Sequence, residues 1–437
     1  MQTHFTPAQL ADPDLQSADA ILRRCVHCGF CNATCPTYQI TGDELDGPRG
    51  RIYLIKGLLE GDGAASNKVA GHLDRCLSCL ACMTTCPSGV NYMHLIDQAR
   101  PRIVNHAGRD WPARWQRGLL ARLLPHVARF RLLLVIARHV IKYIPLPLRL
   151  RPLRELLQTA PPDAATPLAA HHPATAPRRG AVALLAGCVQ QVFGSEINLA
   201  TVRLLNRAGY DVDVIKDACC GAIAHHLGHE SNALAQIRTN ATRWSEGAGR
   251  WQAIIVNASG CGTMLKDYAY LLRNDPGCAA AVATLVPLFK DISEFMAMDG
   301  NLPPATAAPA GLRIISQAPC SLRHGQLVSE QPRQLLQEHG FIVIAAPNDN
   351  TCCGSAGTYN LLQPELAETL GRNKAAALDA AGGDVIASGN LGCMMQIGRF
   401  SNLPRVHTVQ LLDWASGGPR PSAIANGRQT RYSRVND

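Results

Sequence analysis

Eight of the 17 cysteines in this chain fall into two runs with the same spacing. The first run is Cys25-x2-Cys28-x2-Cys31-x3-Cys35-Pro36, and the second is Cys76-x2-Cys79-x2-Cys82-x3-Cys86-Pro87. Three cysteines at every third position let one tight loop direct three thiolates towards one centre, while the fourth follows after a longer gap. This spacing predicts that the first 100 residues fold around two inorganic centres.

The spacing is that of the ligand run for a [4Fe–4S] cluster in bacterial two-cluster ferredoxins, where the fourth cysteine binds the other cluster. We therefore predict one cluster held by Cys25, Cys28, Cys31 and Cys86, and a second held by Cys76, Cys79, Cys82 and Cys35. Zinc fits less well, because zinc sites usually combine two separated cysteine pairs. Disulfides need an oxidising compartment. The cysteine runs thus predict a chain that handles electrons one at a time.

The composition predicts a multidomain protein outside the oxidising compartments. The chain has 437 residues, of which 47% are apolar, enough for two to four domains. The N-terminus has no basic segment followed by an apolar core, as a secretory signal would. Apolar runs such as 132–137 are far too short to span a bilayer. We expect a soluble or peripheral protein of the reducing cytoplasm.

The net charge of +9 is concentrated in residues 101–157, which we predict to be a basic amphipathic helical spacer. Between Pro101 and Glu155, 12 Arg or Lys residues stand against two acids. Leucines recur there at helical spacing, for example at 119–120 and 123–124. Such a segment can pack its leucines under a solvated arginine face, or contact an anionic membrane or another subunit. Outside this segment the chain is near neutral, unlike a uniformly basic nucleic-acid-binding protein, so no nucleic-acid partner is expected.

The remaining organisation follows from composition. Residues 1–100 are predicted to form a mainly helical ferredoxin-like module, with helices at 48–59, ended by Gly61, and at 68–73. Residues 158–180 are rich in Ala and Pro and are predicted to be a linker. The polar tail, residues 418–437, is predicted to be disordered. Arg23, Arg24 and Arg75 stand beside the cysteine runs and would favour the reduced state of a cluster.

Residues 181–413 contain a duplication. Cys188, Cys219-Cys220-Gly221 and Cys261 recur as Cys320, Cys352-Cys353-Gly354 and Cys393, at offsets of 132, 133 and 132 residues. Three landmarks that stay in step indicate two copies of one domain, residues 181–300 and 311–413.

Strand-like and helical stretches alternate in each copy. Strand-like runs at 181–185, 253–256, 312–315 and 385–387 each precede a cysteine, and helical stretches include 198–208 and 364–381. This alternation predicts a parallel sheet in each copy, with cysteines at the carboxyl ends of strands, where open α/β sheets place their sites. The predicted fold class is therefore α/β multidomain: a mainly helical ferredoxin-like module followed by two duplicated α/β cysteine-rich domains.

The second cysteine set is a candidate for a further redox site. Adjacent cysteines are poorly placed to be two corners of one ordinary cubane, while the glycine that follows permits a tight turn presenting both sulfurs. The set could ligate an additional iron–sulfur centre of different arrangement, or form a redox-active disulfide. Its members are Cys188, Cys219, Cys220, Cys261, Cys320, Cys352, Cys353 and Cys393. His225, His226 and His324 lie nearby in sequence, while Cys278 falls outside the repeat and is expected to be an ordinary core or surface residue.

These repeats resemble the cysteine-rich CCG domain found in heterodisulfide reductase and in several partner subunits of flavin dehydrogenases. The fuller motif ends in a Cys-x2-Cys pair. In this chain the second position of that pair holds Met264 in one copy and Gln396 in the other. Each copy thus lacks one thiolate of the fuller motif.

Several strings together resemble the glycolate oxidase (glycolate dehydrogenase) iron–sulfur subunit family. They are Cys25-Val-His-Cys-Gly-Phe-Cys31, Gly42-Asp-Glu-Leu-Asp-Gly-Pro-Arg-Gly-Arg-Ile-Tyr-Leu-Ile-Lys56, Ala258-Ser-Gly-Cys-Gly262 and Cys352-Cys-Gly-Ser-Ala-Gly-Thr-Tyr359. The 42–56 string favours this family over the related lactate and glycerol-3-phosphate dehydrogenase subunits, which stay as alternatives together with a CCG-domain thiol/disulfide redox enzyme.

The resemblance implies a division of labour within an oxidoreductase complex. Flavin-containing subunits would oxidise glycolate to glyoxylate, and this chain would accept the electrons singly and pass them towards the quinone pool. It implies a protein peripheral to the cytoplasmic face of the inner membrane. The chain shows no G-x-G-x-x-G opening a strand–helix unit and no Walker A motif. We therefore expect no catalytic residue and no substrate oxidation from this chain alone.

Overall fold

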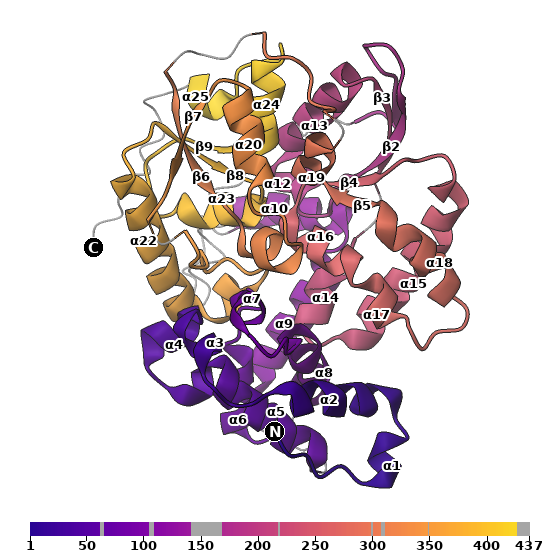
Figure 1. Ribbon diagram of the computed structural model, residues 1–437, viewed down its shortest axis with the longest axis vertical. Coiled ribbons are helices and arrows are strands. Elements are labelled where there is room, and N and C mark those ends of the chain that lie inside the picture. Colours follow the sequence, from indigo (N-terminus) through magenta and orange to yellow (C-terminus); the bar gives the residue numbers. More distant parts are fainter. Residues whose placement is uncertain are drawn as a thin grey trace.

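The structure is a computed structural model that describes residues 1–61, 65–104, 109–140, 168–216, 219–298, 300–306, 311–347 and 349–425. A helical N-terminal module forms one end of the molecule, and two α/β repeats lie side by side at the other end (Figure 1). The predicted fold class is confirmed.

The N-terminal module is built from short helices around a small core. Its elements are α1 (Pro7–Leu10), α2 (Pro13–Arg24), α3 (Phe30–Ala33), α4 (Pro36–Thr41), η1 (Glu44–Asp46), α5 (Pro48–Glu60), α6 (Asn67–Asp74), α7 (Ala81–Thr85) and α8 (Tyr92–Val104). Leu22, Ile55, Leu73 and Leu95 are completely buried between α2, α5, α6 and α8. Both helices expected here are confirmed, since α5 begins at Pro48 and ends before Gly61, and α6 includes residues 68–73.

The boundary expected after residue 100 falls inside a continuous helix, because α8 runs through Pro101 to Val104. Two further helices, α9 (Trp111–Leu123) and α10 (Val127–Val140), confirm helical structure in the first part of the spacer. Leu124, Phe130 and Leu134 are buried in a core shared with the repeats. Residues 141–157 of the spacer lie outside the described residues.

The predicted linker (158–180) and the predicted disordered tail (418–437) both include residues that form regular secondary structure. His171–His172 form β1, which pairs with β3 (Tyr210–Ile215), because an edge strand offers unpaired backbone groups that an extended segment can satisfy. In the tail, Ser422–Ala425 form the short helix α25, whose Ile424 is buried against the core. Residues 158–167 and 426–437 lie outside the described residues.

The first repeat is a five-stranded sheet with the order β1-β3-β2-β4-β5. All pairs are parallel except β1 with β3. Its other strands are β2 (Gly180–Leu185), β4 (Ile254–Val256) and β5 (Phe289–Asp291). Its helices are α12 (Gln190–Phe193), α13 (Ser195–Arg207), α14 (Ala222–His226), α15 (Glu230–Ala248), α16 (Ser259–Lys266), α17 (Tyr268–Leu271), α18 (Ala279–Leu285), η3 (Val286–Leu288) and α19 (Ile292–Ala297).

The second repeat has the parallel order β7-β6-β8-β9, which is the order of the first sheet without β1. Its strands are β6 (Arg313–Gln317), β7 (Ile342–Ala345), β8 (Val385–Ser388) and β9 (Arg405–His407). Its helices are η4 (Ser321–Gly325), α20 (Gln331–Glu338), α21 (Tyr359–Leu362), α22 (Pro364–Ala380), α23 (Leu391–Ile397) and α24 (Thr408–Ala415). The shared strand order confirms the duplication.

The two repeats share one core. Leu204 and Leu205 of α13 and Leu411 and Leu412 of α24 are almost fully buried in the same cluster. At its edge, Arg203 and Arg207 of α13 bind the buried carboxylate of Asp413. Among the described residues, no helix combines the length and the apolar character that crossing a bilayer requires.

Candidate functional site

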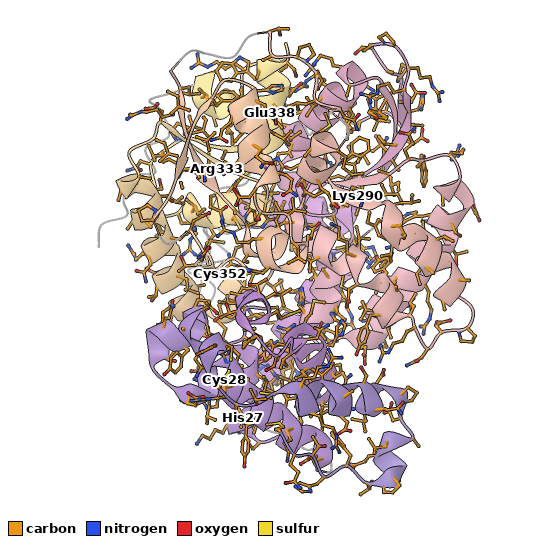
Figure 2. All side chains as sticks on the ribbon, in the orientation of Figure 1. His27, Cys28, Lys290, Arg333, Glu338 and Cys352 are labelled. Carbon is orange, nitrogen blue, oxygen red and sulfur yellow. The ribbon has the colours of Figure 1, made fainter. Side chains whose placement is uncertain are left out.

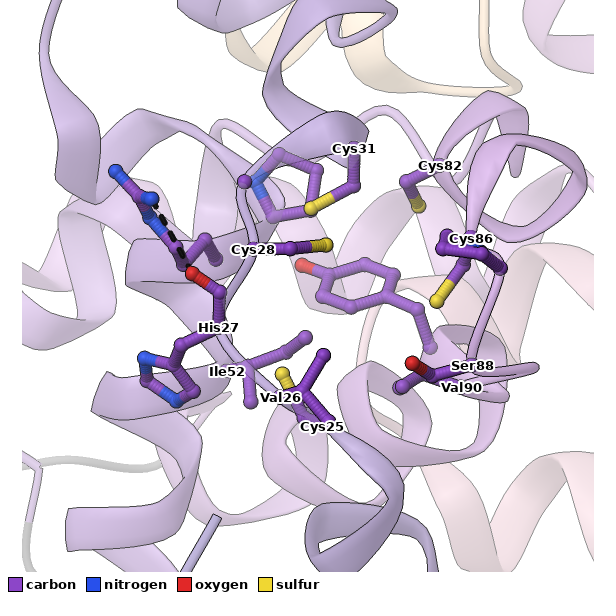
Figure 3. A pocket seen from close by; sticks show the side chains of 15 residues that line it. Cys25, Val26, His27, Cys28, Cys31, Ile52, Cys82, Cys86, Ser88 and Val90 are labelled. Carbon is purple, nitrogen blue, oxygen red and sulfur yellow. Dashed lines mark hydrogen bonds between the residues drawn. The ribbon is translucent and has the colours of Figure 1, made fainter.

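The cysteines of the N-terminal module gather into two groups. The first, which we call the outer cage, consists of Cys25, Cys28, Cys31 and Cys86; their sulfurs point into one small cavity of about 30 Å³ (Figure 3). Burial raises the pKa of Cys31 to about 11, and the nearby Cys25, Cys86 and Cys28 raise it further. Cys28 is exposed, so the outer cage reaches the protein surface.

The second group, which we call the inner cage, consists of Cys76, Cys79, Cys82 and Cys35. Burial raises the pKa of Cys82 well above its usual range, and Cys79, Cys76 and Cys35 add to that effect. Cys82 also lines the cavity of the outer cage, which places the two cages next to each other (Figure 3). Cys86 of the second run thus lies with the first-run cysteines around this cavity, and Cys35 of the first run is among the groups near Cys82.

The two cysteine loops have the same backbone conformation. His27 and Ser78, each two residues after the first cysteine of its run, have positive φ angles of 57° and 49°. Two residues later, Gly29 (φ 84°) and Leu80 (φ 62°) also have positive φ angles, and they are the N-cap residues of α3 and α7. A non-glycine residue in this region costs roughly 1–2 kcal/mol. The shared strain indicates that both loops are shaped to hold sulfurs rather than for stability alone.

Among the described residues, no three cysteine sulfurs all lie within 4.8 Å of one another, so the cages are not drawn together around a single metal ion. Given a Zn–S distance of 2.3 Å, the sulfurs of a tetrahedral zinc site lie about 3.8 Å apart. Among the described residues, the side-chain groups tight enough for one ion are Asp97–His225–His226 and Asp43–Asp46–His72, and neither contains a cysteine. Both also contact an arginine, since Arg100 donates to His226 and Arg75 donates to Asp46. The positive charge of these arginines disfavours a cation there.

The eight cysteines of the repeats line one large cavity of about 300 Å³ between the two copies, which we call the thiol cavity. The first quartet is Cys188, Cys219, Cys220 and Cys261, and the second quartet is Cys320, Cys352, Cys353 and Cys393. All eight follow the carboxyl ends of parallel strands, as expected. The inner face of the α9–α10 region completes the wall with Arg117, Leu124 and Phe130.

The thiols of each quartet are in contact but are not bonded to each other. The sulfurs of Cys188 and Cys219 are 3.7 Å apart, and those of Cys320 and Cys352 are 3.8 Å apart, well beyond a disulfide bond length of about 2.05 Å. The hydrogen bond to Cys352, followed by burial, raises the pKa of Cys320 well above its usual range. In the first quartet, the hydrogen bond from Cys188 lowers the pKa of Cys219.

The inner cage abuts the second quartet. Leu77 and Cys79 of the module pack in one cluster with Cys320, Cys352 and Tyr359. After burial, the nearness of Cys320 contributes most to the raised pKa of Cys79. Figure 2 accordingly shows Cys352 at the boundary with the module, whereas Cys28 lies deeper in the module, farther from the repeats. The cages and the second quartet therefore form a continuous series of sulfur sites.

The neighbouring histidines make hydrogen bonds. His226 lines the thiol cavity, where its side chain is exposed, and accepts a hydrogen bond of 3.2 Å from Arg100. His324 is bonded to Thr84 of the module at 2.8 Å. Cys278 is buried in the core of the first repeat, as expected.

The positions that lack a cysteine differ between the copies. Met264 is buried in the core of the first repeat. Gln396 lines the thiol cavity, where its amide donates to the carbonyl of Ala367 at 2.9 Å. Sequence reasoning missed the thiol cavity itself, which depends on how the two copies pack. It also missed the buried Arg51 beside the inner cage, although Arg51 stands within the 42–56 string.

Comparison with known proteins agrees with this geometry. Residues 21–90 match the family model of a 4Fe-4S dicluster domain, and residues 182–266 and 314–398 match that of a cysteine-rich domain. The chain is 37% identical over 419 residues, 95% of its length, to a protein of Escherichia coli (strain K12) named glycolate oxidase iron-sulfur subunit, and covers 99% of that protein. It is 32% identical over 91% of its length to a protein of Bacillus subtilis (strain 168) named probable glycolate oxidase iron-sulfur subunit, and covers 94% of that protein.

More distant relatives match less of the chain. A lactate utilization protein A of Bacillus velezensis is 25% identical over 53% of this chain and 98% of its own length. The crystal structure of a hypothetical protein from Helicobacter pylori aligns with 95% of this chain and 74% of its own, with a TM-score of 0.53 and 10% identity. At 10% identity, this similarity shows a related fold and nothing about function.

Proposed function

The chain belongs to the family of glycolate oxidase iron–sulfur subunits, and from this premise we propose that it is the electron-transfer subunit of a complex that oxidises glycolate to glyoxylate. The observation that carries the proposal is the contact between the inner cage and the second quartet. Because of it, sulfur sites follow one another from the exposed Cys28 to the thiol cavity. A chain built this way conducts electrons between partners.

The proposed cofactors of the module are two [4Fe–4S] clusters. Cys25, Cys28, Cys31 and Cys86 would hold one, and Cys76, Cys79, Cys82 and Cys35 the other. The dicluster family match, the matching loops and the wide sulfur spacing support this proposal. When bound, such a cluster takes up and releases single electrons; the residues of this chain set its potential and its accessibility.

A third iron–sulfur centre, held by the two quartets, is the proposed occupant of the thiol cavity. A thiol/disulfide enzyme needs an accessible thiolate of low pKa. Cys352 and Cys353 are instead buried and, like Cys320, have raised pKa values; Cys219, whose pKa is lowered, is buried as well. A metal centre stabilises the thiolate form in such surroundings, because ligands bind it deprotonated. This favours a metal centre over the alternative of a dithiol enzyme.

Iron and acid-labile sulfide analysis of the anaerobically purified full chain tests both cofactor proposals. We expect about eight irons for the two cages and further iron for the proposed centre of the thiol cavity; a total of about eight would contradict that third centre. Replacing Cys28 and Cys79 with Ser together should remove the cage signals from the electron paramagnetic resonance (EPR) spectrum and leave any signal of the thiol cavity. A chain that binds only zinc would contradict the proposal.

The proposed partners are flavin-containing subunits that donate electrons and a quinone pool that receives them. The relatives with glycolate in their names match this chain along nearly its whole length, whereas the lactate utilization protein matches half of it. We therefore rank a lactate or glycerol-3-phosphate complex second. An assay of the co-purified complex against a panel of 2-hydroxy acids tests this ranking. Glycolate should give the highest kcat/KM, and the isolated chain should oxidise none of them.

The proposed location is the cytoplasmic face of the inner membrane, with α9 and α10 as the contact. Five of the large apolar side chains exposed in the described residues belong to these helices: Trp111, Trp115, Leu132, Val135 and Ile136. Exposed arginines accompany them, including Arg114, Arg122, Arg129 and Arg131. Tryptophan with arginine on an amphipathic surface is typical of proteins that lie on anionic lipid.

A vesicle flotation assay tests the membrane contact. The full chain should bind vesicles of phosphatidylglycerol and phosphatidylcholine, and it should bind pure phosphatidylcholine less. The double variant W111E/W115E should lose most of this binding, whereas the control L327E, which changes an exposed leucine of the second repeat, should keep it. Equal binding by both variants would contradict this contact.

A further inference from the structure

Helix α5 carries two arginines that serve different cages. Arg49 lies near the outer cage, where its guanidinium lines the same cavity as Cys25, Cys28 and Cys31. Arg51, two residues later, is buried beside Cys35 of the inner cage, with 1% of its surface exposed. The same helix therefore places one cation at the rim of the outer cage and another inside the wall of the inner cage.

The contacts of Arg51 fix its guanidinium against the inner cage. Its Nε donates to the carbonyl of His72 at 2.8 Å, and its Nη1 donates to the hydroxyl of Thr37 at 3.1 Å. Nη1 also lies 3.9 Å from the sulfur of Cys35. Nη2 is buried and makes no hydrogen bond with any described residue. A sulfur-rich group held by the cage would offer that nitrogen an acceptor.

The charge of Arg51 is permanent. Burial opposes the charge, yet Cys76, Tyr92, Cys35 and Asp46 together raise the pKa of Arg51 above its ordinary value. Asp46, the nearest carboxylate at 3.7 Å, is shared with His72 and Arg75, which lie 2.8 and 3.0 Å from it. One carboxylate therefore neutralises only part of the positive charge around it. The positive charge that Asp46 leaves unneutralised would attract negative charge added to the inner cage.

Among the described residues, the outer cage has no side-chain cation buried as Arg51 is; the cations near it are Arg49 and the ammonium of Met1, which donates to the backbone carbonyls of Leu22, Arg23 and Cys25 at the surface side of the module. The side chain of Arg49 is 37% exposed, forms an ion pair of 2.6 Å with Glu44 and donates to the carbonyl of His27. Its charge is thus neutralised by a partner and screened by water, both of which weaken its effect on the sulfurs. Cluster potentials rise with nearby positive charge and with hydrogen bonds to sulfur. The two cages therefore differ in the feature that sets potential.

We infer that Arg51 is the residue that makes the inner cage easier to reduce than the outer cage and so directs electrons inward. The inference rests on the proposed function, because it presumes a cluster in each cage. In the step concerned, one electron leaves the reduced outer cluster and enters the oxidised inner cluster. The outer cluster is oxidised, the inner cluster is reduced, and no proton moves because Arg51 stays protonated.

The test is a redox titration of the full chain followed by EPR. The Cys28→Ser variant assigns the outer signal, because Cys28 belongs to that cage alone. In the wild type, the inner signal should appear at the higher potential. Arg51→Gln should lower the ratio of reduced to oxidised inner cluster about tenfold at a fixed potential, which is 59 mV for a one-electron couple. Arg49→Gln, the matched control on the same helix, should shift the outer signal much less.

Two further variants guard against misfolding of Arg51→Gln. Arg51→Lys keeps the charge and should give a shift of the same sign but smaller size. Asp46→Asn removes the counter-charge and should shift the inner signal the opposite way. Iron content and circular dichroism show whether each variant is assembled.

Several results would overturn the inference. One is an unchanged inner potential in an assembled Arg51→Gln variant, and another is an outer signal at the higher potential in the wild type, which needs no variant. If Arg51→Gln does not assemble, an unshifted Arg51→Lys together with an unshifted Asp46→Asn has the same meaning. Absence of both clusters from the wild type would instead refute the proposed function.

Discussion

The two repeats have the same strand order and equivalent cysteines, yet they have different neighbours. The second quartet packs against Leu77 and Cys79 of the inner cage. The first repeat meets the module through other side chains, such as His94 with Asp267 at 2.9 Å and Arg100 with His226 at 3.2 Å. The duplicated backbone therefore carries two different tasks. We expect the second quartet to receive electrons from the inner cage, and the first quartet to follow it.

The largest effect should come from removing one thiol from each quartet. Cys320→Ser should slow electron transfer out of the inner cage by at least about 10- to 100-fold, since even residues behind the ligands have effects of that size. Cys188→Ser, the equivalent change in the first repeat, should spare this first step. After rapid mixing with a reductant, freeze-quench EPR should show the inner cage staying reduced only in Cys320→Ser. Equal behaviour of the two variants would mean that the repeats are equivalent acceptors.

A second comparison uses the glycine that follows each cysteine pair. Gly221 and Gly354 have φ angles of +83° and +82°, a region unfavourable for other residues. A Cβ on Gly354 would lie 2.7 Å from the carbonyl oxygen of Ala367, whereas on Gly221 its nearest contact is the Ile237 side chain at 3.4 Å. We expect Gly354→Ala to cost about 3 kcal/mol through strain and overpacking, and Gly221→Ala about 1 kcal/mol.

Thermal unfolding of the two alanine variants measures this difference. Gly354→Ala should lower the unfolding midpoint clearly more than Gly221→Ala. It should also disturb the inner-cage EPR signal, because Ala367 packs in the same cluster as Leu77. Similar midpoints for the two variants would show that the backbone at Ala367 yields easily.

The sequence predicted those features that depend on spacing, and it missed those that depend on packing. The cysteine runs, the duplication and the strands β2, β4, β6 and β8 follow from local pattern. Strand β3 escaped because its alternating Asp211 and Asp213 interrupt the apolar run, and β5 (Phe-Lys-Asp) and β9 (Arg-Val-His) escaped because each has one apolar residue beside charged or polar ones. The wall of the thiol cavity comes from segments that are far apart in the chain, so no local pattern marks it.

Within the module, closeness in sequence also failed to predict which arginine lies beside a cage. Arg23, Arg24 and Arg75 stand next to cysteines in the sequence, but Arg23 pairs with Asp19 and Arg75 with Asp46. Arg51 is 16 residues from Cys35 and nevertheless lies 3.9 Å from its sulfur. A charged residue inside a helix indicates a solvated face in most sequences. Only the packing of α5 between the cysteine loops makes Arg51 a buried cation.

The last strand of each sheet ends in a buried residue that caps the helix after it. Asp291 ends β5 and caps α19, where its carboxylate accepts the N–H of Ser293 at 2.8 Å. Burial raises the pKa of Asp291 to about 7, above the unfolded value of about 3.9. The folded state therefore holds the proton more tightly, and stability falls as the pH rises from about 4 to about 7.

Asp291→Asn should remove this loss while keeping the cap, since asparagine is an equally good capping residue. Between pH 5 and pH 8, the wild type should lose about 2 kcal/mol that the variant retains. Thermal midpoints at the two pH values, measured for both proteins, give the difference. A wild-type advantage that persists at pH 8 would mean that Asp291 is ionised in the folded protein.

The equivalent position in the second repeat holds a base instead of an acid. His407 ends β9 and caps α24, and its Nδ1 accepts the N–H of Val409 at 3.2 Å, which requires an unprotonated Nδ1. Burial lowers the pKa of His407 to about 4, below the unfolded value of about 6.5. Stability from this group is therefore present above a pH of about 6.5 and is lost as the pH falls towards 4, the opposite of Asp291.

His407→Asn should keep the cap and make the variant about 1–2 kcal/mol less sensitive to acidification from pH 8 to pH 5. Thermal midpoints of the single variants and of the Asp291→Asn/His407→Asn double variant test this. The midpoint of the double variant should depend less on pH than that of the wild type, both towards acid and towards neutral pH. If His407→Asn lost as much stability as the wild type between pH 8 and pH 5, His407 would not be held neutral in the folded protein. The two capping positions would then be equivalent in the fold but not in their protonation.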